Sequence, residues 1–328
     1  MRKVLELKDY LEGLQNKDRT ILARAITLVE STNPDHQKLA QELLRALLPK
    51  TGTAKRIGIS GTPGVGKSTF IEAFGKLLTS QNKTVAVLAV DPTSQVSGGS
   101  ILGDKTRMNE LAIDSHAFIR PSPSGETLGG VAKRTRESLL LCEAFGFDYV
   151  LVETVGVGQS ETAVAQMVDI FIMLLQPGAG DDLQGIKRGI LEIVDMVVVT
   201  KDDGDQQKAI QKAKHDYQHA LHILRHEGWV PPVLSCSALT KKGLPEVQTE
   251  IENYFMNQQS LITQKRDKQG IDWMWQLTLD NLKDLFRSSV GTQEIKNIEK
   301  QILDKKMTSP EGAAKLLQAF THIKLTSS

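Results

Sequence analysis

Gly61-Thr62-Pro63-Gly64-Val65-Gly66-Lys67-Ser68 follows directly on a short apolar run, Arg56-Ile57-Gly58-Ile59-Ser60. The spacing matches the phosphate-binding pattern G-x-x-x-x-G-K-[ST], in which glycines let backbone N–H groups crowd around a triphosphate. Lys67 can then reach the β and γ phosphates, and the Ser68 hydroxyl can reach Mg²⁺. The run from Thr69 to Leu78 predicts a helix whose positive N-terminal end faces the same anion. The sequence therefore predicts a strand, a loop and a helix that bind a nucleoside triphosphate through residues 61–69.

The composition excludes several classes of function. The 328 residues are 40% hydrophobic, and 40 Lys and Arg residues against 39 Asp and Glu residues leave a net charge of +1. This balance gives no electrostatic footprint for nucleic acid or an anionic membrane. The N-terminus mixes both charge signs, and no apolar run is long enough to span a bilayer. Cys142 and Cys236 have surroundings typical of reduced, buried thiols. Together these features lead us to expect a cytoplasmic protein without nucleic-acid or membrane partners.

The chain divides by sequence pattern into three parts. Residues 1–52 have helical periodicity and form an N-terminal helical extension, in which Asn33-Pro34-Asp35 is a helix start signal and Leu39, Leu43, Leu44 and Leu47 share one face. Residues 53–257 form a P-loop domain. Residues 258–328 form a C-terminal helical region, joined to that domain by the polar segment Asn257 to Gln269.

Short β-branched runs alternate with amphipathic stretches throughout the P-loop domain. Near-continuous apolar runs of this kind indicate strands that are buried on both faces. The predicted architecture is an α/β, doubly wound, mostly parallel sheet with helices on both faces, and its ligands lie beyond the carboxyl ends of the strands. The predicted strands after the first are 84–90, 117–119, 149–152, 170–175, 196–199 and 233–235.

Three acids follow predicted strands or the loops after them. Glu153 ends the run 149–152, three residues before Gly156, which suits an acid that orients a Mg²⁺-bound water while the glycine N–H approaches the γ-phosphate. Asp91 ends the run 84–90, and Asp104 precedes a helical stretch. Since Mg²⁺ takes only one or two direct protein ligands besides phosphate, these acids cannot all join Ser68 as direct ligands, and some must hold water instead.

Two further loops predict the base. Thr200-Lys201-Asp202-Asp203 matches [NT]-K-x-D, in which the last carboxylate accepts hydrogen bonds from the ring N–H and the exocyclic amine of guanine. Adenine offers no such donor pair, so Asp203 indicates GTP. Ser237-Ala238-Leu239 resembles the element whose backbone N–H contacts the guanine carbonyl. The order and separation of these loops favour a guanine nucleotide.

Together these residues resemble the metallochaperone-like group of P-loop GTPases and, within it, the methylmalonyl-CoA mutase-associated GTPases, also described as the ArgK or lysine/arginine/ornithine transport ATPase family. The resemblance is carried by residues 61–69, 90–93, 98–108, 153–161, 180–185 and 201–205. It implies a cytosolic, homodimeric GTPase chaperone that binds the adenosylcobalamin-dependent methylmalonyl-CoA mutase, gates delivery of intact cofactor and helps to discard damaged cofactor. It also implies that the C-terminal helices form a dimerisation arm.

The resemblance assigns roles to individual positions. Lys67, Asp91, Asp104 and Glu153 would be catalytic, and Ser68 with the same three acids would hold the metal and its water. Residues 176–187 match a mobile third switch that signals the nucleotide state, with the switch positions Gln176, Asp181, Asp182, Gln184 and Lys187.

The sequence also predicts how hydrolysis proceeds. Water attacks the γ-phosphate in line, and Lys67 and Mg²⁺ neutralise the developing charge. Val157 stands where a water-orienting glutamine would follow Gly156, so intrinsic hydrolysis should be slow. A missing group or arginine finger is worth about 10³–10⁵ in rate, which a partner could supply or order through Lys187 and Arg188.

Alternatives remain open at this stage. His215, His219, His222 and His226 recur at helical spacing, which would suit a metallochaperone, but a polar helix face is the favoured explanation, since the sequence has neither a Cys-x-Cys-Cys motif nor a His-rich tail. A kinase that acts on periplasmic amino-acid binding proteins is a second alternative, although the sequence has neither a kinase catalytic loop nor a targeting segment. An assembly factor for another acyl-CoA mutase, such as an isobutyryl-CoA or ethylmalonyl-CoA enzyme, is a third.

Overall fold

A parallel sheet of seven strands forms the centre of the molecule, in the order β3-β2-β4-β1-β5-β6-β7. All six strand pairings are parallel. Each predicted strand is present, and the doubly wound α/β architecture is confirmed. The strands are β1 Lys55–Gly61, β2 Val85–Val90, β3 Ala117–Arg120, β4 Tyr149–Thr154, β5 Ile170–Leu175, β6 Met196–Val199 and β7 Val233–Ser235.

This computed structural model describes residues 5–90, 108–121, 128–154, 160–178, 188–224 and 229–326. The chain forms two compact units, Met1–Arg266 and Asp267–Ser328. The first contains the sheet and its helices. The second contains the remainder of one long helix together with two further helices.

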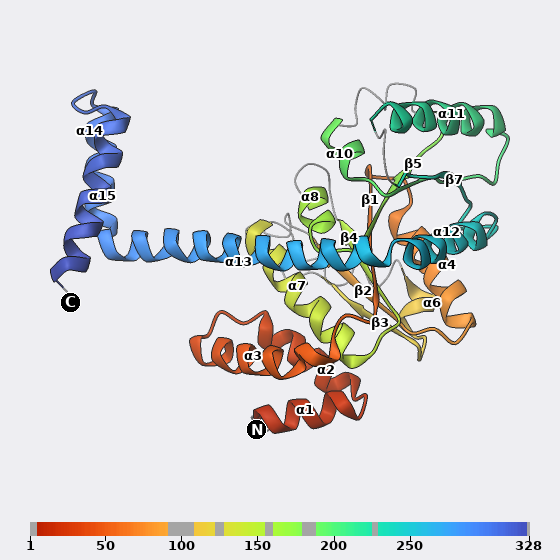
Figure 1. The fold of residues 1–328 in the computed structure, drawn as a ribbon, viewed down its shortest axis with the longest axis horizontal. Helices are drawn as coiled ribbons and strands as arrows, with labels where there is room; N and C mark the ends of the chain where they lie inside the picture. Colours follow the sequence, from red (N-terminus) through yellow and green to blue (C-terminus); the bar gives the residue numbers. More distant parts are fainter. Residues whose placement is uncertain are drawn as a thin grey trace. The chain divides into compact units, whose positions relative to one another are not determined.

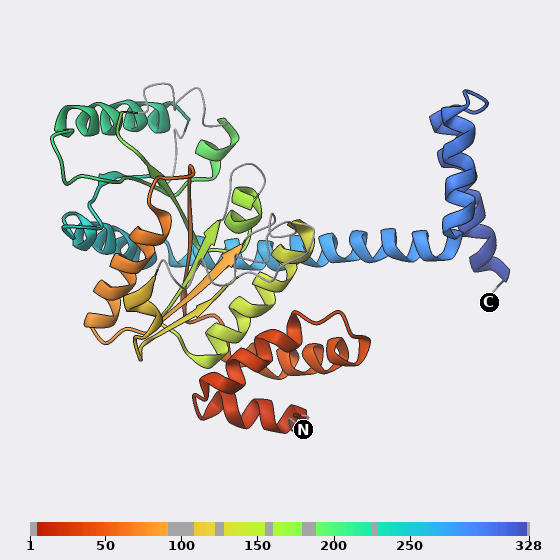
Figure 2. The same cartoon turned by 180° about the vertical axis from the view of Figure 1, so that it is seen from behind.

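Alternate residues of each strand enter two separate cores, one on each face of the sheet. In β2, Val85 and Val87 join the core with helices α4 (Lys67–Ser80), α6 (Asn109–Ala112) and α12 (Leu244–Asn257). Ala86 and Leu88 join the opposite core. That core contains α7 (Leu128–Phe145), α8 (Ser160–Ala165), α10 (Arg188–Ile193) and α11 (Gln207–Leu224). Figures 1 and 2 show α4 and α6 on one side of the sheet and α7 and α8 on the other.

The N-terminal helices extend the second of these cores. They are α1 (Leu7–Gln15), α2 (Arg19–Val29) and α3 (Pro34–Leu47), followed by the short 3-10 helix η1 (Leu48–Lys50). Asn33 caps α3, because its side-chain oxygen accepts hydrogen bonds from the backbone N–H groups of Asp35 and His36 at 2.9 and 3.4 Å. Glu30, at the end of α2, pairs with Arg120 at the end of β3. The predicted start signal is confirmed, and the helices are joined to the sheet by charge as well as by apolar contacts.

The predicted polar link, Asn257 to Gln269, is helical for most of its length, which its polar composition did not indicate. α12 ends at Asn257, and α13 (Gln259–Val290) begins almost at once. The Arg266 guanidinium donates to both carboxylate oxygens of the fully buried Asp169, at 2.7 and 2.6 Å. Lys265 donates to the Asp169 carbonyl at 2.7 Å. The polar side chains are therefore anchors of the first turns of α13, because they satisfy a buried acid.

The second unit is purely helical where the structure describes it. It holds the rest of α13, then α14 (Thr292–Leu303) and α15 (Ser309–Thr326). Phe286 and Phe320 bring α13 and α15 together, with ring centroids 5.3 Å apart. A row of large apolar side chains on α13 is nevertheless exposed, namely Ile271, Met274, Trp275, Leu279, Leu282 and Leu285.

Candidate nucleotide-binding site

The phosphate loop joins β1 to α4 at the carboxyl edge of the sheet, as predicted. Gly64 and Gly66 have φ values of +80° and +97°, a conformation that L side chains rarely adopt. A Cβ atom at either position would meet nothing within 4 Å, so the glycines are needed for backbone conformation and not for space. The turn directs the N-terminus of α4 towards the loop, which is the arrangement that binds phosphate.

The Lys67 ammonium lies against the loop. Its Nζ donates to the carbonyl oxygens of Gly61 at 2.7 Å and Thr62 at 3.3 Å. Burial lowers the pKa of Lys67, while the negative charges of Glu153 and Glu161 act in the opposite direction. A partly desolvated cation beside backbone N–H donors interacts more strongly with phosphate than an exposed lysine does.

Glu153 and Ser68 meet beside this lysine. The pairing of β4 with β1 sets Glu153 opposite Ile59, and its side chain is 4% exposed. The Ser68 hydroxyl donates to Glu153 Oε1 at 3.1 Å. One hydroxyl and one carboxylate are oxygen ligands of the kind that Mg²⁺ accepts beside phosphate oxygens. The residues present therefore fit the predicted metal.

The predicted base-binding loops also meet. The Ser237 hydroxyl donates to Asp203 Oδ2 at 2.5 Å, which connects the loop after β6 with the loop after β7. The Ser237 oxygen in turn accepts from the backbone N–H of Thr240 at 3.1 Å. Asp203 itself is exposed. Its carboxylate is thus oriented by a buried neighbour and still open to a ligand.

Thr200 and Lys201 connect the base-binding loop to the phosphate loop, which spacing alone did not reveal. The Thr200 hydroxyl donates to the Val65 carbonyl at 2.8 Å. Lys201 Nζ donates to the Gly64 carbonyl at 3.1 Å and to Gln176 Oε1 at 3.0 Å. Gln176 is the first residue of the predicted third switch, so one lysine contacts the phosphate loop and the start of that segment.

Asp202 is a residue that sequence reasoning missed. It is 5% exposed and accepts hydrogen bonds from Gln207 Nε2 at 2.7 Å and from Lys242 Nζ and Ser235 Oγ, both at 2.9 Å. Burial alone would raise the pKa of Asp202, but the hydrogen bonds from these three residues outweigh it and lower the pKa. Asp202 therefore supports the loop that presents Asp203.

The remaining predicted positions divide into three groups. Pro63 lies in the turn of the phosphate loop, between β1 and α4. Thr69, Ala238 and Leu239 line a cavity of about 570 Å³ between α4 and the start of α12. The other positions lie outside the described residues: Asp91, Asp104, Gly156, Asp181, Asp182, Gln184 and Lys187.

The histidine row is only partly described. His215, His219 and His222 are exposed on α11, and His226 lies outside the described residues. Within the ranges that the structure covers, no group of three or more His, Cys, Asp or Glu side chains could hold a metal ion. Cys142 and Cys236 are free and buried, as predicted.

Among the helices in the described ranges, none is long and apolar enough to cross a membrane.

Comparison with known proteins gives a consistent result. The family described as methylmalonyl Co-A mutase-associated GTPase MeaB matches residues 22–290. GTPase ArgK of Escherichia coli is 52% identical, over 85% of this chain and 86% of its own length. The mitochondrial methylmalonic aciduria type A homolog of Mus musculus is 44% identical, over 96% of this chain and 83% of its own.

A solved structure described as an LAO/AO transport system kinase superposes with a TM-score of 0.77 at 40% identity, and the match covers 96% of this chain and 99% of that one. The matches extend beyond the P-loop motif to both helical ends of the chain. This protein belongs to the family of methylmalonyl-CoA mutase-associated GTPases and is a P-loop GTPase.

Proposed function

We propose that the protein binds GTP with Mg²⁺, hydrolyses it to GDP and phosphate, and acts as a chaperone of an adenosylcobalamin-dependent methylmalonyl-CoA mutase. In this role it gates cofactor loading and protects or reactivates the mutase. The observation that carries the nucleotide part is the convergence of Lys67, Ser68 and Glu153 at one end of the site and of Asp203 with Ser237 at the other. The family and the mouse relative support the mutase as partner.

The residues of this chain divide the work of hydrolysis. Lys67 binds the β and γ phosphates and stabilises charge that develops on the γ-phosphate, while the backbone N–H groups of the loop and of α4 hold the chain of phosphates in place. Ser68 would be a direct ligand of Mg²⁺, and one of Glu153, Asp91 and Asp104 could be a second, while the other acids would hold the ion through its bound water; Asp91 and Asp104 lie outside the described residues. The ion, when bound, supplies charge neutralisation at the phosphate oxygens.

Guanine is selected at the other end of the site. The Asp203 carboxylate accepts two hydrogen bonds from guanine, and Ser237 holds that carboxylate in place. The Lys201 stem packs across the ring, while the Lys201 ammonium contacts Gln176. We propose that residues 176–187 respond to loss of the γ-phosphate and transmit the change to the mutase. Intrinsic turnover is slow, and the mutase accelerates it either by supplying a group of its own or by ordering a group of this chain, such as Lys187 or Arg188.

A homodimer completes the proposal. The exposed apolar row on α13 has the spacing of a helix seam, and an exposed row of this size marks an interaction surface. A second copy of the chain covers it. The protein works in the cytoplasm beside the mutase.

Single-turnover hydrolysis of GTP labelled at the γ-phosphate tests this function. We expect slow release of labelled inorganic phosphate, faster release with saturating methylmalonyl-CoA mutase, and neither with Lys67→Ala. An unchanged rate in the presence of the mutase would disprove partner activation. Replacing methylmalonyl-CoA mutase with an isobutyryl-CoA or ethylmalonyl-CoA mutase in the same assay identifies which enzyme is the partner.

Two other functions have specific motivations. The description of the solved relative as a transport system kinase motivates a kinase, in which case the label would appear on an amino-acid binding protein instead of in free phosphate. The histidines of α11 motivate a metallochaperone. That function requires stoichiometric Zn²⁺ or Ni²⁺ in the purified protein and loss of the metal in His219→Ala.

A further inference from the structure

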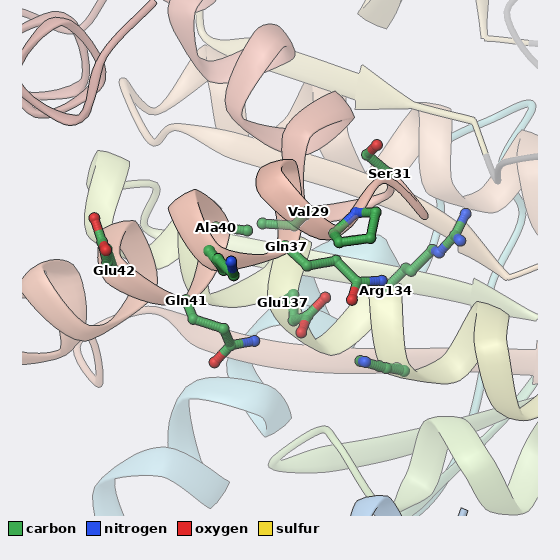
Figure 3. A pocket seen from close by; sticks show the side chains of 11 residues that line it. Val29, Ser31, Gln37, Ala40, Gln41, Glu42, Arg134 and Glu137 are labelled. Carbon is green, nitrogen blue, oxygen red and sulfur yellow. The ribbon is translucent and has the colours of Figure 1, made fainter. Parts of the chain in front are cut away.

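A second cavity lies away from the nucleotide, between the N-terminal helices and α7. Its volume is about 620 Å³. Val29, Ser31, Gln37, Ala40 and Gln41 line one side of it, and α7 contributes Glu137. Figure 3 shows Glu137 reaching from α7 into the space bordered by the side chains of Gln37 and Gln41 on α3.

Glu137 is the unusual group in this cavity. Its side chain is only 3% exposed, and among the described residues no hydrogen-bond donor reaches its carboxylate. Burial raises the pKa of Glu137 to about 7, although the nearby charges of Lys133 and Arg134 act to lower it. A buried carboxylate without a donor is costly, and a ligand that brings a donor would remove that cost.

We propose that this cavity binds a small organic monocation, a primary ammonium or guanidinium compound, through the Glu137 carboxylate. The groups around the carboxylate support this chemistry. The amide oxygens of Gln37 and Gln41 are further acceptors, and Val29 and Ala40 offer an apolar wall to an aliphatic stem.

The charged rim limits the ligand further. Lys38 and Glu42 of α3 are exposed, while Lys133 and Arg134 of α7 are half-buried. His36 does not line the cavity, but its ring bonds at 2.8 Å to the hydroxyl of Ser31, which does, so it is a further titratable group near the site. These rim charges are screened by water more than the buried Glu137 is, but three cations there would repel a polycation. A single positive charge on an aliphatic stem therefore suits the cavity best.

Binding of butylguanidinium to the full-length protein, measured by calorimetry and compared with the uncharged butylurea of similar shape, tests the proposal. We expect a dissociation constant of about 1 mM for a ligand of this size at pH 8 and at least about tenfold weaker binding of butylurea. Amide NMR resonances of α3 and α7 should shift in parallel with the calorimetric titration. Equal affinity of the two compounds, or the absence of saturable butylguanidinium binding, would overturn it.

Variants locate the site. Glu137→Gln keeps the size of the side chain but removes its charge, and should weaken butylguanidinium at least about tenfold. Glu42→Gln removes an exposed rim carboxylate and should change binding less than about twofold. Equal losses of butylguanidinium affinity in both variants would contradict the proposal, because the cation would then be attracted by the net charge of the surface and not by Glu137. GDP affinity should be unchanged in both, which checks that the variants are folded.

The pH dependence of butylguanidinium binding is a second test, and it needs no Glu137 variant. Only ionised Glu137 can pair with the cation, so the wild-type affinity should fall about tenfold between pH 8 and pH 6 for a group whose pKa is about 7. His36→Gln should retain this fall. An affinity that stays constant over this range, or a fall that disappears in His36→Gln, would contradict the assignment to Glu137.

Discussion

Asp203 and Asp202 are adjacent carboxylates with different surroundings, and the difference predicts different losses on mutation. Asp203 is exposed and held by Ser237, so Asp203→Asn should remove a charge-assisted pair of hydrogen bonds to guanine. We expect GTP affinity to fall at least about a hundredfold, because each charged hydrogen bond is worth about 1.5–3 kcal/mol. Xanthine carries an oxygen where guanine has its amine, so XTP should bind the variant better than GTP does. Competition against a fluorescent GDP analogue measures both affinities.

Asp202→Asn should weaken nucleotide binding in a different way. The hydrogen bonds that the Asp202 carboxylate accepts in the described structure all come from protein side chains, so we expect it to make no contact with the base. Lys242, Gln207 and Ser235 would each lose a charged acceptor, and the loop that presents Asp203 would become less ordered. We expect all guanine nucleotides to weaken by about tenfold without any preference for xanthine, and unfolding to require about 1–3 kcal/mol less. The same competition assay, run with GTP and with XTP, measures whether the Asp202→Asn variant prefers either nucleotide. A preference for XTP in this variant would mean that Asp202 itself reads the base.

Glu137 predicts a pH-dependent stability. Its pKa is about 7 in the folded chain, against an ordinary value of 4.5. As the pH rises from 4.5 to 7 the unfolded chain loses this proton first, so the folded chain loses stability over this window, by about 3 kcal/mol in total. Glu137→Gln should therefore be more stable than wild type at pH 8 and nearly equal to it at pH 4.5. Urea unfolding at the two pH values measures this, and a gain independent of pH would contradict it.

At the scale of elements, the first turns of α13 depend on a buried ion pair. Arg266→Met keeps the aliphatic volume but leaves Asp169, which is fully buried, without its charged partner. Removing one member of such a pair costs about 3–5 kcal/mol, so the urea midpoint should fall accordingly. Lys283→Met is the matched control, because Lys283 and Asp280 form an exposed pair on the same helix. It should change stability by less than about 0.5 kcal/mol. Similar losses in the two variants would mean that Arg266 acts through helix propensity alone.

Local signals predicted most elements, and distant pairings explain the rest. Strands such as β2 and β4 were predictable because both faces of each are buried, which requires continuous apolar runs. The α3 cap was predictable because Asn33 needs only its own next residues. The contact of Arg266 with Asp169 spans 97 positions, and that of Lys242 with Asp202 spans 40, so neither has a local pattern. For the same reason the sequence predicted only a polar link over 257–269, where the first turns of α13 lie, and assigned no role to Asp202 in its motif.

For the whole molecule, the exposed row on α13 predicts self-association. Leu282→Asp places a charge in the middle of the row, and should convert a dimer into a monomer of 36.1 kDa in sedimentation equilibrium. Burying an unpaired charge at an apolar interface costs several times the energy that one leucine contributes. Lys283→Asp, one position further along the helix, is the control and should remain dimeric. A monomeric wild-type protein would contradict the proposed seam.

The anchoring of α13 has a practical consequence for dissecting the protein into fragments. Arg266 donates to the carbonyl oxygens of Gly52 at 2.5 Å and Ala54 at 2.7 Å, immediately before β1, in addition to Asp169. A fragment truncated after Asn257 would lose these contacts and leave the buried Asp169 carboxylate, just before β5, without its charged partner. A fragment truncated after Arg266 would retain all of them. An isolated GTPase core for studies of nucleotide exchange should therefore end within α13, a few residues beyond Arg266. It should not end at the junction between α12 and α13.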